Sequence, residues 1–430
     1  MGRQGVLRSW LVRTLGLTVL ALGGLAGAAQ GKVTIYIAYP HSGASEASLK
    51  QVIADFNASQ GEIEALGQYV PYSQISQEKL QVMVAGGQPP DVALLADLLV
   101  AQYAAVDGLI PLDPYLTRDG IRPDEFWPSS WRVGNWQGHH WAMPHTQDAR
   151  ALFINLDHLE SAGLDAVHGP RTLDELVSFT RKLTERNHDG TLARLGFAPW
   201  VWEGWFYTWG WLFGGDFYDA AAARVTVNEP RLVEAMSWLA DFARNVVTPA
   251  EASTAADFFQ QRMSMVVAGN WTLADIKRNV PDLPFGVVPI PPPAGRGLST
   301  WSGIWTMVIP RGAPHPDAAW EFIKFAVRGR AAVTNAIISS AVPGHIPAAR
   351  EAVRVLSEEY GRQYETFLEL MPYSHERPTM PVGSLMWDKL AEAMNDVIAG
   401  RQAPAAALDN ANRQIQAALD EAMARWRADH

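Results

Sequence analysis

The chain has 430 residues, of which 48% are hydrophobic and 19% are charged, and its formal net charge at pH 7 is −10. This composition indicates a globular protein with two or three cores and excludes disorder over most of the length. The negative charge disfavours nucleic acid and anionic membrane surfaces as partners. The sequence contains no cysteine, so the fold has no disulfide bonds and must be held by its core.

The first thirty residues have the pattern of a secretory signal peptide. Arginines at positions 3, 8 and 13 come without any acidic residue, an apolar run from Leu15 to Leu25 follows, and the small residues AGAA come next. We therefore predict a signal peptide over residues 1–29. Its removal takes away the three arginines and changes the formal charge from −10 to −13. Because there is no cysteine to carry a lipid, we expect a periplasmic protein that is not lipid-anchored.

Strand and helix patterns alternate in the next part of the chain. A β-branched and aromatic run predicts a strand at 32–39, and the apolar spacing of 49–59 predicts a helix. Strands at 63–70 and 89–96 follow, with a helix at 77–86 between them. Steps of this kind predict an α/β sheet wound with helices on both faces.

After Ala151 the pattern becomes more helical. The Pro/Gly-rich segment 284–297 precedes another strand pattern, and we place a crossing between two lobes there. The C-terminal residues 384–427 predict helix with a break at 400–404. The remaining predicted elements are helices at 172–187, 230–247 and 317–328, the last capped by Gly329, and strands at 264–270 and 305–310.

Five indoles lie within twelve positions of the segment GFAPWVWEGWFYTWGWLFGG at 196–215. A glutamate, a proline and several glycines interrupt this run, so it does not predict a membrane-spanning helix. As a helix the segment would place Trp202, Trp205, Trp209 and Phe213 on one face. An indole covers the face of a sugar ring and donates a hydrogen bond through its N–H. A carbohydrate platform is therefore one interpretation, and a helix buried on all sides is the other.

Enzyme motifs are absent from the sequence, which has no G-x-S-x-G, no H-E-x-x-H, no phosphate-binding loop and no cysteine nucleophile. A glycosidase needs two carboxylates about 5 to 9.5 Å apart, and Glu203 and Asp216 are the candidates near the indoles. A secreted glycoside hydrolase is thus an alternative. His139, His140 and His145 suggest a metal site, but adjacent histidines on a strand point to opposite faces. No catalytic residue, cofactor or metal ion is predicted.

Several segments occur in a characteristic order along the mature chain. They are DFNAS, EKLQVMVAGGQPPDVALL, GLIPLDPYL, HHWAMPHTQDARALFINLDHLESAGL, TLDELVSFTRKL, FFQQRMSMVVAGNW, TWSGIWTMVI, AAWEFIKFAV and AVPGHIPA. In this order the chain resembles the extracellular (periplasmic) solute-binding proteins, family 1, of bacterial carbohydrate ABC importers. It resembles most the branch that contains the glycerol-3-phosphate binders. The resemblance covers nearly the whole mature chain.

The resemblance implies an α/β, two-lobe periplasmic-binding-protein fold of type II, in which each lobe is a sheet flanked by helices and the ligand cleft lies between the lobes. We expect residues 32–142 and 272–330 to form the first lobe, and residues 143–271 and 331–430 the second, more helical one. The resemblance also implies a monomeric binding protein, not an enzyme. Such a protein captures a small-molecule carbohydrate and delivers it to the transmembrane permease subunits of an ABC importer, which a cytoplasmic ATPase drives.

A ligand site between two lobes needs residues from separate parts of the chain. By resemblance, loops of the first lobe would face residues of the PHTQDAR, tryptophan and VPGHIP segments. Structural roles remain alternatives, since Asp97 would also cap a helix, His345 would fill a turn, and Trp271 and Trp301 would pack in a core. The expected ligand-binding residues are His41, Ser42, Tyr72, Asp97, Gln147, Asp148, Trp202, Trp205, Asn270, Trp271, Trp301 and His345.

The chain departs from the glycerol-3-phosphate binders near its C-terminus. Those proteins carry an arginine that contacts phosphate, and Pro381 of TMPVGSLMW stands in its place here. Proline offers an anion neither charge nor N–H, although Arg377 lies nearby and would substitute on a different backbone path. The carboxylates of Asp97 and Asp148 would accept hydrogen bonds from hydroxyl groups and repel phosphate. We therefore expect a neutral di- or oligosaccharide, with glycerol-3-phosphate or a phosphodiester as the alternative.

Overall fold

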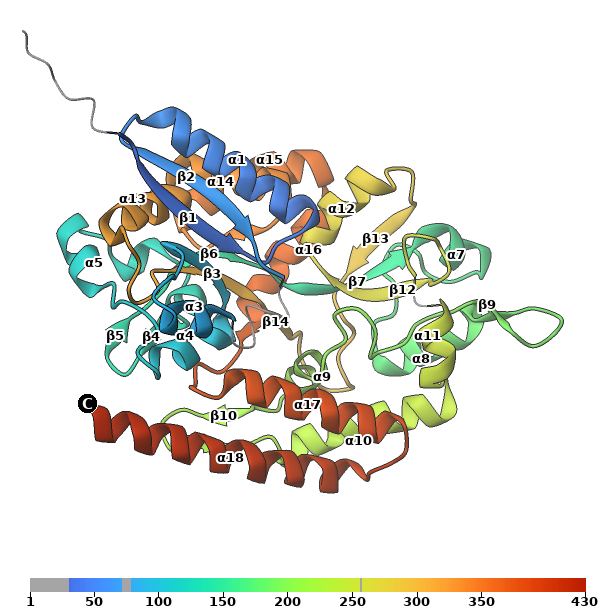
Figure 1. Ribbon diagram of the computed structural model, residues 1–430. Coiled ribbons are helices and arrows are strands. Elements are labelled where there is room, and N and C mark those ends of the chain that lie inside the picture. Colours follow the sequence, from blue (N-terminus) through green and yellow to red (C-terminus); the bar gives the residue numbers. More distant parts are fainter. Residues whose placement is uncertain (1–30, 72–78, 256) are drawn as a thin grey trace, which may run out of the picture.

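Two separate β-sheets organise the chain. The computed structural model describes residues 31–71, 79–255 and 257–430, and Figure 1 shows how their helices and strands are arranged. The larger sheet has the strand order β16-β6-β15-β3-β1-β2, and the smaller sheet has the order β12-β7-β13. The predicted signal peptide and Tyr72 lie outside the described residues.

The larger sheet mixes parallel and antiparallel strands. Strand β1 runs parallel to β2 and β3, whereas β15 runs antiparallel to β3 and β6. Alternate residues of β3 face different cores: Leu94 packs in the core of Ile37, and Leu95 packs in the core of Leu99. The strands of this sheet are β1 (Val33–Tyr39), β2 (Ile63–Tyr69), β3 (Val92–Ala96), β6 (Met143–Gln147), β15 (Ile304–Val308) and β16 (Val342–Pro343).

Helices cover both faces of the larger sheet, as the sequence predicts. On one face α1 (Gly43–Ser59) packs against α13 (Pro316–Ala326) and α14 (Gly329–Ser339), and α4 (Asp97–Ala104) packs on the other. Because β1 and β3 are parallel, their carboxyl ends reach the same edge of the sheet. The helices α1 and α4 follow these strands, so both begin at that edge.

The smaller sheet is antiparallel and has β7 at its centre, with every residue of this strand buried. The largest core of the protein surrounds it and includes Phe153, Trp209 and Leu239. The strands are β7 (Arg150–Asn155), β12 (Met265–Gly269) and β13 (Phe285–Val288), and the main helices of this region are α8 (Leu173–Leu183), α9 (Phe206–Leu212), α10 (Pro230–Asn245), α12 (Trp271–Asn279) and α16 (Arg362–Leu370).

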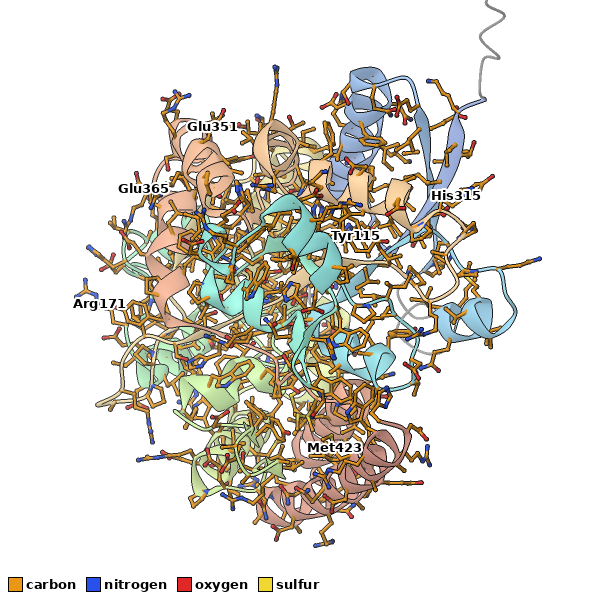
Figure 2. All side chains as sticks on the ribbon, turned by 90° about the vertical axis from the view of Figure 1, so that its left-hand side faces the viewer. Tyr115, Arg171, His315, Glu351, Glu365 and Met423 are labelled. Atoms are coloured by element: carbon orange, nitrogen blue, oxygen red, sulfur yellow. The ribbon has the colours of Figure 1, made fainter. Side chains whose placement is uncertain are left out.

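Two long helices, α17 (Gly383–Ile398) and α18 (Pro404–Asp429), end the chain and confirm the predicted helical C-terminus with its break. Figure 1 shows them side by side at one end of the molecule, and Met423 of α18 marks the same end in the turned view of Figure 2. Helix α17 packs against both α10 and α4. Trp426 meets Trp136 with ring centroids 4.6 Å apart. The C-terminal pair therefore contacts the surroundings of both sheets.

Short elements complete the described fold. Within the described ranges, no helix has both the length and the apolar surface that crossing a bilayer requires. The short strands β14 and β17 pair in parallel. The short elements, together with the longer α15, are α3 (Lys79–Ala85), α5 (Asp113–Asp119), η1 (Pro123–Glu125), α6 (Pro128–Arg132), β4 (Asn135–Trp136), β5 (His139–His140), α7 (Leu156–Ser161), β8 (Glu185–Arg186), β9 (Leu192–Arg194), β10 (Tyr218–Asp219), β11 (Arg224–Val225), α11 (Pro249–Ala255), β14 (Thr300–Ser302), α15 (Ile346–Tyr360), η2 (Met371–Tyr373) and β17 (Ser374–Glu376).

The tryptophan segment is not one continuous helix. Helix α9 begins only at Phe206, and turns occupy the residues from Pro199 to Glu203. Trp202 has a φ of 53°, which lies outside the right-handed helical region. The predicted helical face that joins Trp202 and Trp205 to Trp209 is therefore wrong. The role of Gly329 is also wrong, since this residue begins α14 and does not cap α13.

The chain crosses between the two sheets at identifiable places. It passes from the larger to the smaller sheet between Gln147 and Arg150 and returns between Val288 and Ile304. The second crossing includes part of the predicted Pro/Gly-rich segment. The predicted lobes have breaks after residues 142, 271 and 330. These breaks group β6 and β16 with the smaller sheet and β13 with the larger sheet, whereas each strand belongs to the other sheet. We propose lobe boundaries that follow the sheets at these crossings.

Candidate functional site

A cavity of about 410 Å³ lies between the two sheets. On one side its wall comes from the start of α1, the ends of β3 and β6, and parts of β15 and α14. On the other side the wall comes from β7, β14, α12 and α17, together with residues that precede α9 and follow β17. The wall thus brings together segments that are far apart in the sequence.

Five indoles line this cavity, and each comes from a different element or its flank. The rings of Trp205 and Trp387 have centroids 4.7 Å apart, and those of Trp301 and Trp387 are 6.2 Å apart. Trp301 is buried, whereas the other four are half-buried, so they present part of their surface to the cavity. The lining indoles are Trp205, Trp271, Trp301, Trp305 and Trp387.

A buried arginine at the start of β7 organises one side of the wall. Arg150 forms ion pairs with the carboxylates of Asp148 and Glu203, the latter at 3.0 Å. Its guanidinium carbon lies 3.6 Å from the ring centroid of Trp301, a cation–π contact. Burial raises the pKa of Asp148 to about 6, against the lowering effect of Arg150. The charge of this arginine is therefore offset inside the wall.

Gly303 lets the chain pass close to this ion pair. Its backbone N–H donates a hydrogen bond of 2.6 Å to Asp148 Oδ1. A Cβ at this position would lie 3.0 Å from Nη1 of Arg150 and 3.1 Å from Oδ2 of Asp148. These separations are tighter than ordinary contacts, so a side chain here would press on the charged groups.

A second buried arginine lies on the C-terminal side of the cavity. Arg377 forms an ion pair with Asp97, the first residue of α4. Its guanidinium carbon lies 5.2 Å from the ring centroid of Trp301 and 5.4 Å from that of Trp387. Burial raises the pKa of Asp97, and the adjacent Arg377 opposes this shift. The ion pair connects the segment after β17 to the larger sheet.

The start of α1 forms another part of the wall. His41 meets Trp305 edge-on with ring centroids 4.4 Å apart, and burial lowers the pKa of this histidine to about 4. Ser42 occupies the N-cap position of α1 but makes no side-chain capping bond among the described residues. Asp275 of α12 reaches the same place from the smaller sheet and lines the cavity beside them.

Buried polar side chains on β6 complete the wall. The Ser48 hydroxyl donates a hydrogen bond to Asn335 Oδ1. The other end of this amide, Asn335 Nδ2, therefore faces His145 Nε2 at 3.3 Å. Burial lowers the pKa of His145 to about 3. Gln147 Oε1 accepts a hydrogen bond of 2.5 Å from Ser130. Within the described residues, Gln147 Nε2 and His145 Nδ1 have no hydrogen-bond partner.

The family of the chain follows from comparison with known proteins. A family model for the bacterial extracellular solute-binding protein matches residues 40–331. The chain belongs to this family. This solute-binding protein is 22% identical over 426 residues to a binding protein of Brucella abortus (strain 2308), covering 96% of the present chain and 99% of that protein. It is 25% identical over 278 residues to the sn-glycerol-3-phosphate-binding periplasmic protein of Shigella flexneri, with 60% and 62% covered.

Solved structures share the fold of this solute-binding protein. A protein solved with mannobiose bound superposes with a TM-score of 0.81 at 23% identity, covering 89% of the present chain and all of that one. The maltose/maltodextrin-binding domain of Bdellovibrio bacteriovorus, bound to maltotriose, gives a TM-score of 0.78 at 19% identity over 90% of the present chain and 100% of the other. These likenesses confirm the predicted two-lobe periplasmic-binding-protein fold.

The predicted ligand-binding residues divide into four groups in the structure. Asp97 lies behind the cavity wall as the partner of Arg377. Tyr72 lies outside the described residues, and Trp202, Asn270 and His345 do not line the cavity. The predicted residues that the solute-binding protein brings together in the wall are His41, Ser42, Gln147, Asp148, Trp205, Trp271 and Trp301.

The three predicted residues away from the cavity have structural contacts. Trp202 packs edge-on against Phe259 with ring centroids 5.1 Å apart. Asn270 is fully buried, and its side chain bonds the backbone N–H of Ala149 and the carbonyl of Ser340. His345 is the N-cap of α15, where its ring accepts a hydrogen bond from the backbone N–H of residue 348. These contacts give each residue a role in the fold.

Sequence reasoning missed several wall residues of the solute-binding protein. Arg150 ends the PHTQDAR segment and Trp305 lies in TWSGIWTMVI, so the resemblance covers both residues without implying a ligand contact for either. The sequence predicts Glu203 only as a hydrolase carboxylate and Trp387 only as part of a C-terminal helix. No sequence signal marked Asp275, because its contact with α1 is formed between distant parts of the chain.

The candidate residues for a hydrolase site and for a metal site do not come together in the structure. Glu203 lies in the cavity wall and pairs with Arg150, whereas Asp216 lines a different hollow. His139 is exposed on β5, and His140 stacks on a tryptophan ring with centroids 3.9 Å apart. Among the described residues, no three histidine or acidic side chains are grouped to hold a metal ion.

Proposed function

We propose that this protein captures a neutral di- or oligosaccharide in the cavity between its sheets. The observation that carries this proposal is the convergence of five indoles on one cavity that also contains paired carboxylates and buried amides. Indole faces pack on the C–H faces of sugar rings, while carboxylates and amides bond the hydroxyl groups. Such a mixture of apolar faces and a few polar groups is typical of small-molecule sites.

The charges of the wall support a neutral ligand over a phosphorylated one. Arg377 lines the cavity, although proline occupies position 381. Its guanidinium is already paired with Asp97, and Arg150 is paired with Asp148 and Glu203. A phosphate group would have to compete with these carboxylates for the two arginines. A neutral sugar meets no such competition.

The relatives support a carbohydrate ligand and a transport role. The structures with similar folds include proteins bound to mannobiose and to maltotriose. We therefore propose that the mature protein is periplasmic and monomeric and delivers its sugar to the permease of an ABC importer. Glycerol-3-phosphate remains the second candidate ligand, because a relative that binds it matches 60% of the chain.

Titration of the intrinsic tryptophan fluorescence tests the ligand class, because several indoles line the cavity. The purified mature protein is titrated with mannobiose, maltotriose, a wider panel of neutral di- and oligosaccharides, and glycerol-3-phosphate. We expect saturable binding of at least one neutral sugar. Analysis of the solution afterwards should recover that sugar intact, whereas catalytic turnover would make the protein a glycoside hydrolase.

A further inference from the structure

The amino end of helix α1 faces the proposed ligand. His41, Ser42 and Gly43 at this end line the cavity, and the helix behind them has 17 residues. The end of a helix carries roughly half a positive charge and unbonded backbone N–H groups, which attract anions. Without further groups, this end of α1 would favour a phosphate or carboxylate on the solute.

Asp275 fills the place that such an anion would take. This residue comes from α12 beside the smaller sheet and lines the cavity. Burial raises the pKa of its carboxyl, and the backbone N–H of Ala44 in the first turn of α1 opposes this shift. A Cβ at Gly43 would lie 3.2 Å from Asp275 Oδ1, and Gly43 has a φ of 62°. Glycine at this position therefore permits both the backbone turn and the close approach of the carboxylate.

The charge of Asp275 is offset differently from those of the other carboxylates in the wall and behind it. Asp97 pairs with Arg377, and Asp148 pairs with Arg150. Within the described part of the chain Asp275 forms no ion pair. Arg278, also on α12, opposes the rise of its pKa without pairing with it. Neutralising Asp275 would thus remove the negative charge from the helix end without leaving a buried arginine unpaired.

The wall of the same cavity has features of a ligand site. Gln147 is 1% exposed, and its Nε2 has no partner among the described residues. Trp301 is 2% exposed, and its Nε1 likewise has none. Unpaired buried donors are costly unless another molecule bonds them. Together with the cavity, these donors indicate a site that is completed by a solute.

We propose that Asp275 is a specificity-determining residue that excludes anionic solutes by keeping its carboxylate at the amino end of α1. This inference rests on the proposed function, because it concerns the same cavity and names the chemistry that the cavity rejects. The rejected class comprises solutes with a phosphate or carboxylate group. Neutral sugars are accepted because they bring no negative charge to Asp275.

Replacing Asp275→Asn tests the inference, since asparagine keeps the shape and the acceptor oxygen but removes the charge. The probes are glycerol-3-phosphate and inorganic phosphate, measured by calorimetry with the mature protein. We expect the affinity for glycerol-3-phosphate to rise at least tenfold. The ratio of this affinity to the affinity for the neutral sugar identified in the panel should rise as well.

Glu46→Gln is the matched control. Glu46 is also acidic and lies in the first turn of α1, but it pairs with Lys50 and does not line the cavity. We expect no gain of phosphate binding in this variant. An equal gain in both variants would assign the effect to overall charge and overturn the inference.

Other outcomes separate this inference from the proposed function. If the unaltered protein binds no neutral sugar, the proposed function fails. If it binds a neutral sugar but Asp275→Asn gains no affinity for either anionic probe, the inference fails alone. Asp275→Ser provides a second variant should asparagine disturb folding, and absence of a gain in the folded serine variant would contradict the inference in the same way. Tight glycerol-3-phosphate binding by the unaltered protein would contradict both.

Discussion

Arg377 and Asp97 form a buried ion pair between the segment after β17 and the first residue of α4. Their side chains are 7% and 0% exposed, so water screens the pair little. The pair holds the arginine against Trp301 and Trp387 in the cavity wall. It therefore contributes both to the fold and to the shape of the proposed sugar site.

Arg377→Met should destabilise the protein strongly. Breaking a buried pair leaves the Asp97 carboxylate without its guanidinium partner, and such losses typically cost about 3 to 5 kcal/mol. Urea unfolding measures the change in the free energy of unfolding. Arg401→Met is the control, because Arg401 is 60% exposed in its pair with Asp396 and should cost less than about 1 kcal/mol. Equal losses in the two variants would show that burial adds nothing to the Arg377 pair.

Trp205→Ala should weaken sugar binding far more than it weakens the fold. The indole is half-buried, lines the cavity and packs on Trp387. Loss of an aromatic anchor typically costs on the order of 1 to 3 kcal/mol of binding free energy. Trp202→Ala is the comparison, since this nearby indole packs on Phe259 away from the cavity. Fluorescence titration of both variants decides the point, and a larger loss of affinity in Trp202→Ala would favour the original platform prediction.

Much of the fold can be predicted from the sequence because local patterns determine it. The β-branched run of β1 and the apolar run of β3 have the length and composition of strands, and the apolar spacing of α10 is that of a helix. The tryptophan segment is the exception. Several of its indoles fit one face of a helix, but a left-handed backbone at Trp202 interrupts that helix.

The site is less predictable because its contacts join distant residues. Asp97 and Arg377 are separated by most of the mature chain, and Arg150 meets Glu203 from a different element. Residue type does not show which face of a helix lines a cavity, so nothing in the sequence marks Trp387 as a site residue. The family resemblance implies that Asp148 and Trp301 lie near the site, but it does not indicate that an arginine lies between them.

The stability of the protein should fall as the pH is lowered below 6.5, in part through His145. Burial lowers the pKa of His145 to about 3, so the unfolded chain binds a proton there at a higher pH than the native state does. The native state is thus favoured above pH 6.5, and this advantage is lost as the pH falls towards 3. The unfolding free energy of the unaltered protein should decrease from pH 7 to pH 5. His145→Gln should make this decrease smaller by on the order of 1 to 2 kcal/mol.

Urea unfolding at the two pH values tests the role of His145. The exposed His188 provides a matched variant, His188→Gln, which controls for the removal of an imidazole. A pH dependence that is the same in His145→Gln as in the unaltered protein would contradict the assignment.

Gly303→Ala should weaken both the fold and sugar binding. The added Cβ would press on the Arg150 and Asp148 side chains, and overpacking of this kind typically costs about 1 to 3 kcal/mol. Gly297→Ala is the control from the same region, since a Cβ there meets no atom within 4 Å. Thermal unfolding and fluorescence titration measure the two effects. Equal behaviour of the alanine variants would show that the close approach at Gly303 is unimportant.

Calorimetry with neutral sugars and glycerol-3-phosphate at low and physiological salt tests the central claim most directly. Because the cations of the cavity wall are already paired, we predict that at least one neutral di- or oligosaccharide binds with an affinity that changes little with salt. Glycerol-3-phosphate should bind at least tenfold more weakly, a difference of ~1.4 kcal/mol. Tight glycerol-3-phosphate binding that weakens with salt and disappears in Arg377→Ala, with no neutral sugar bound, would contradict the account.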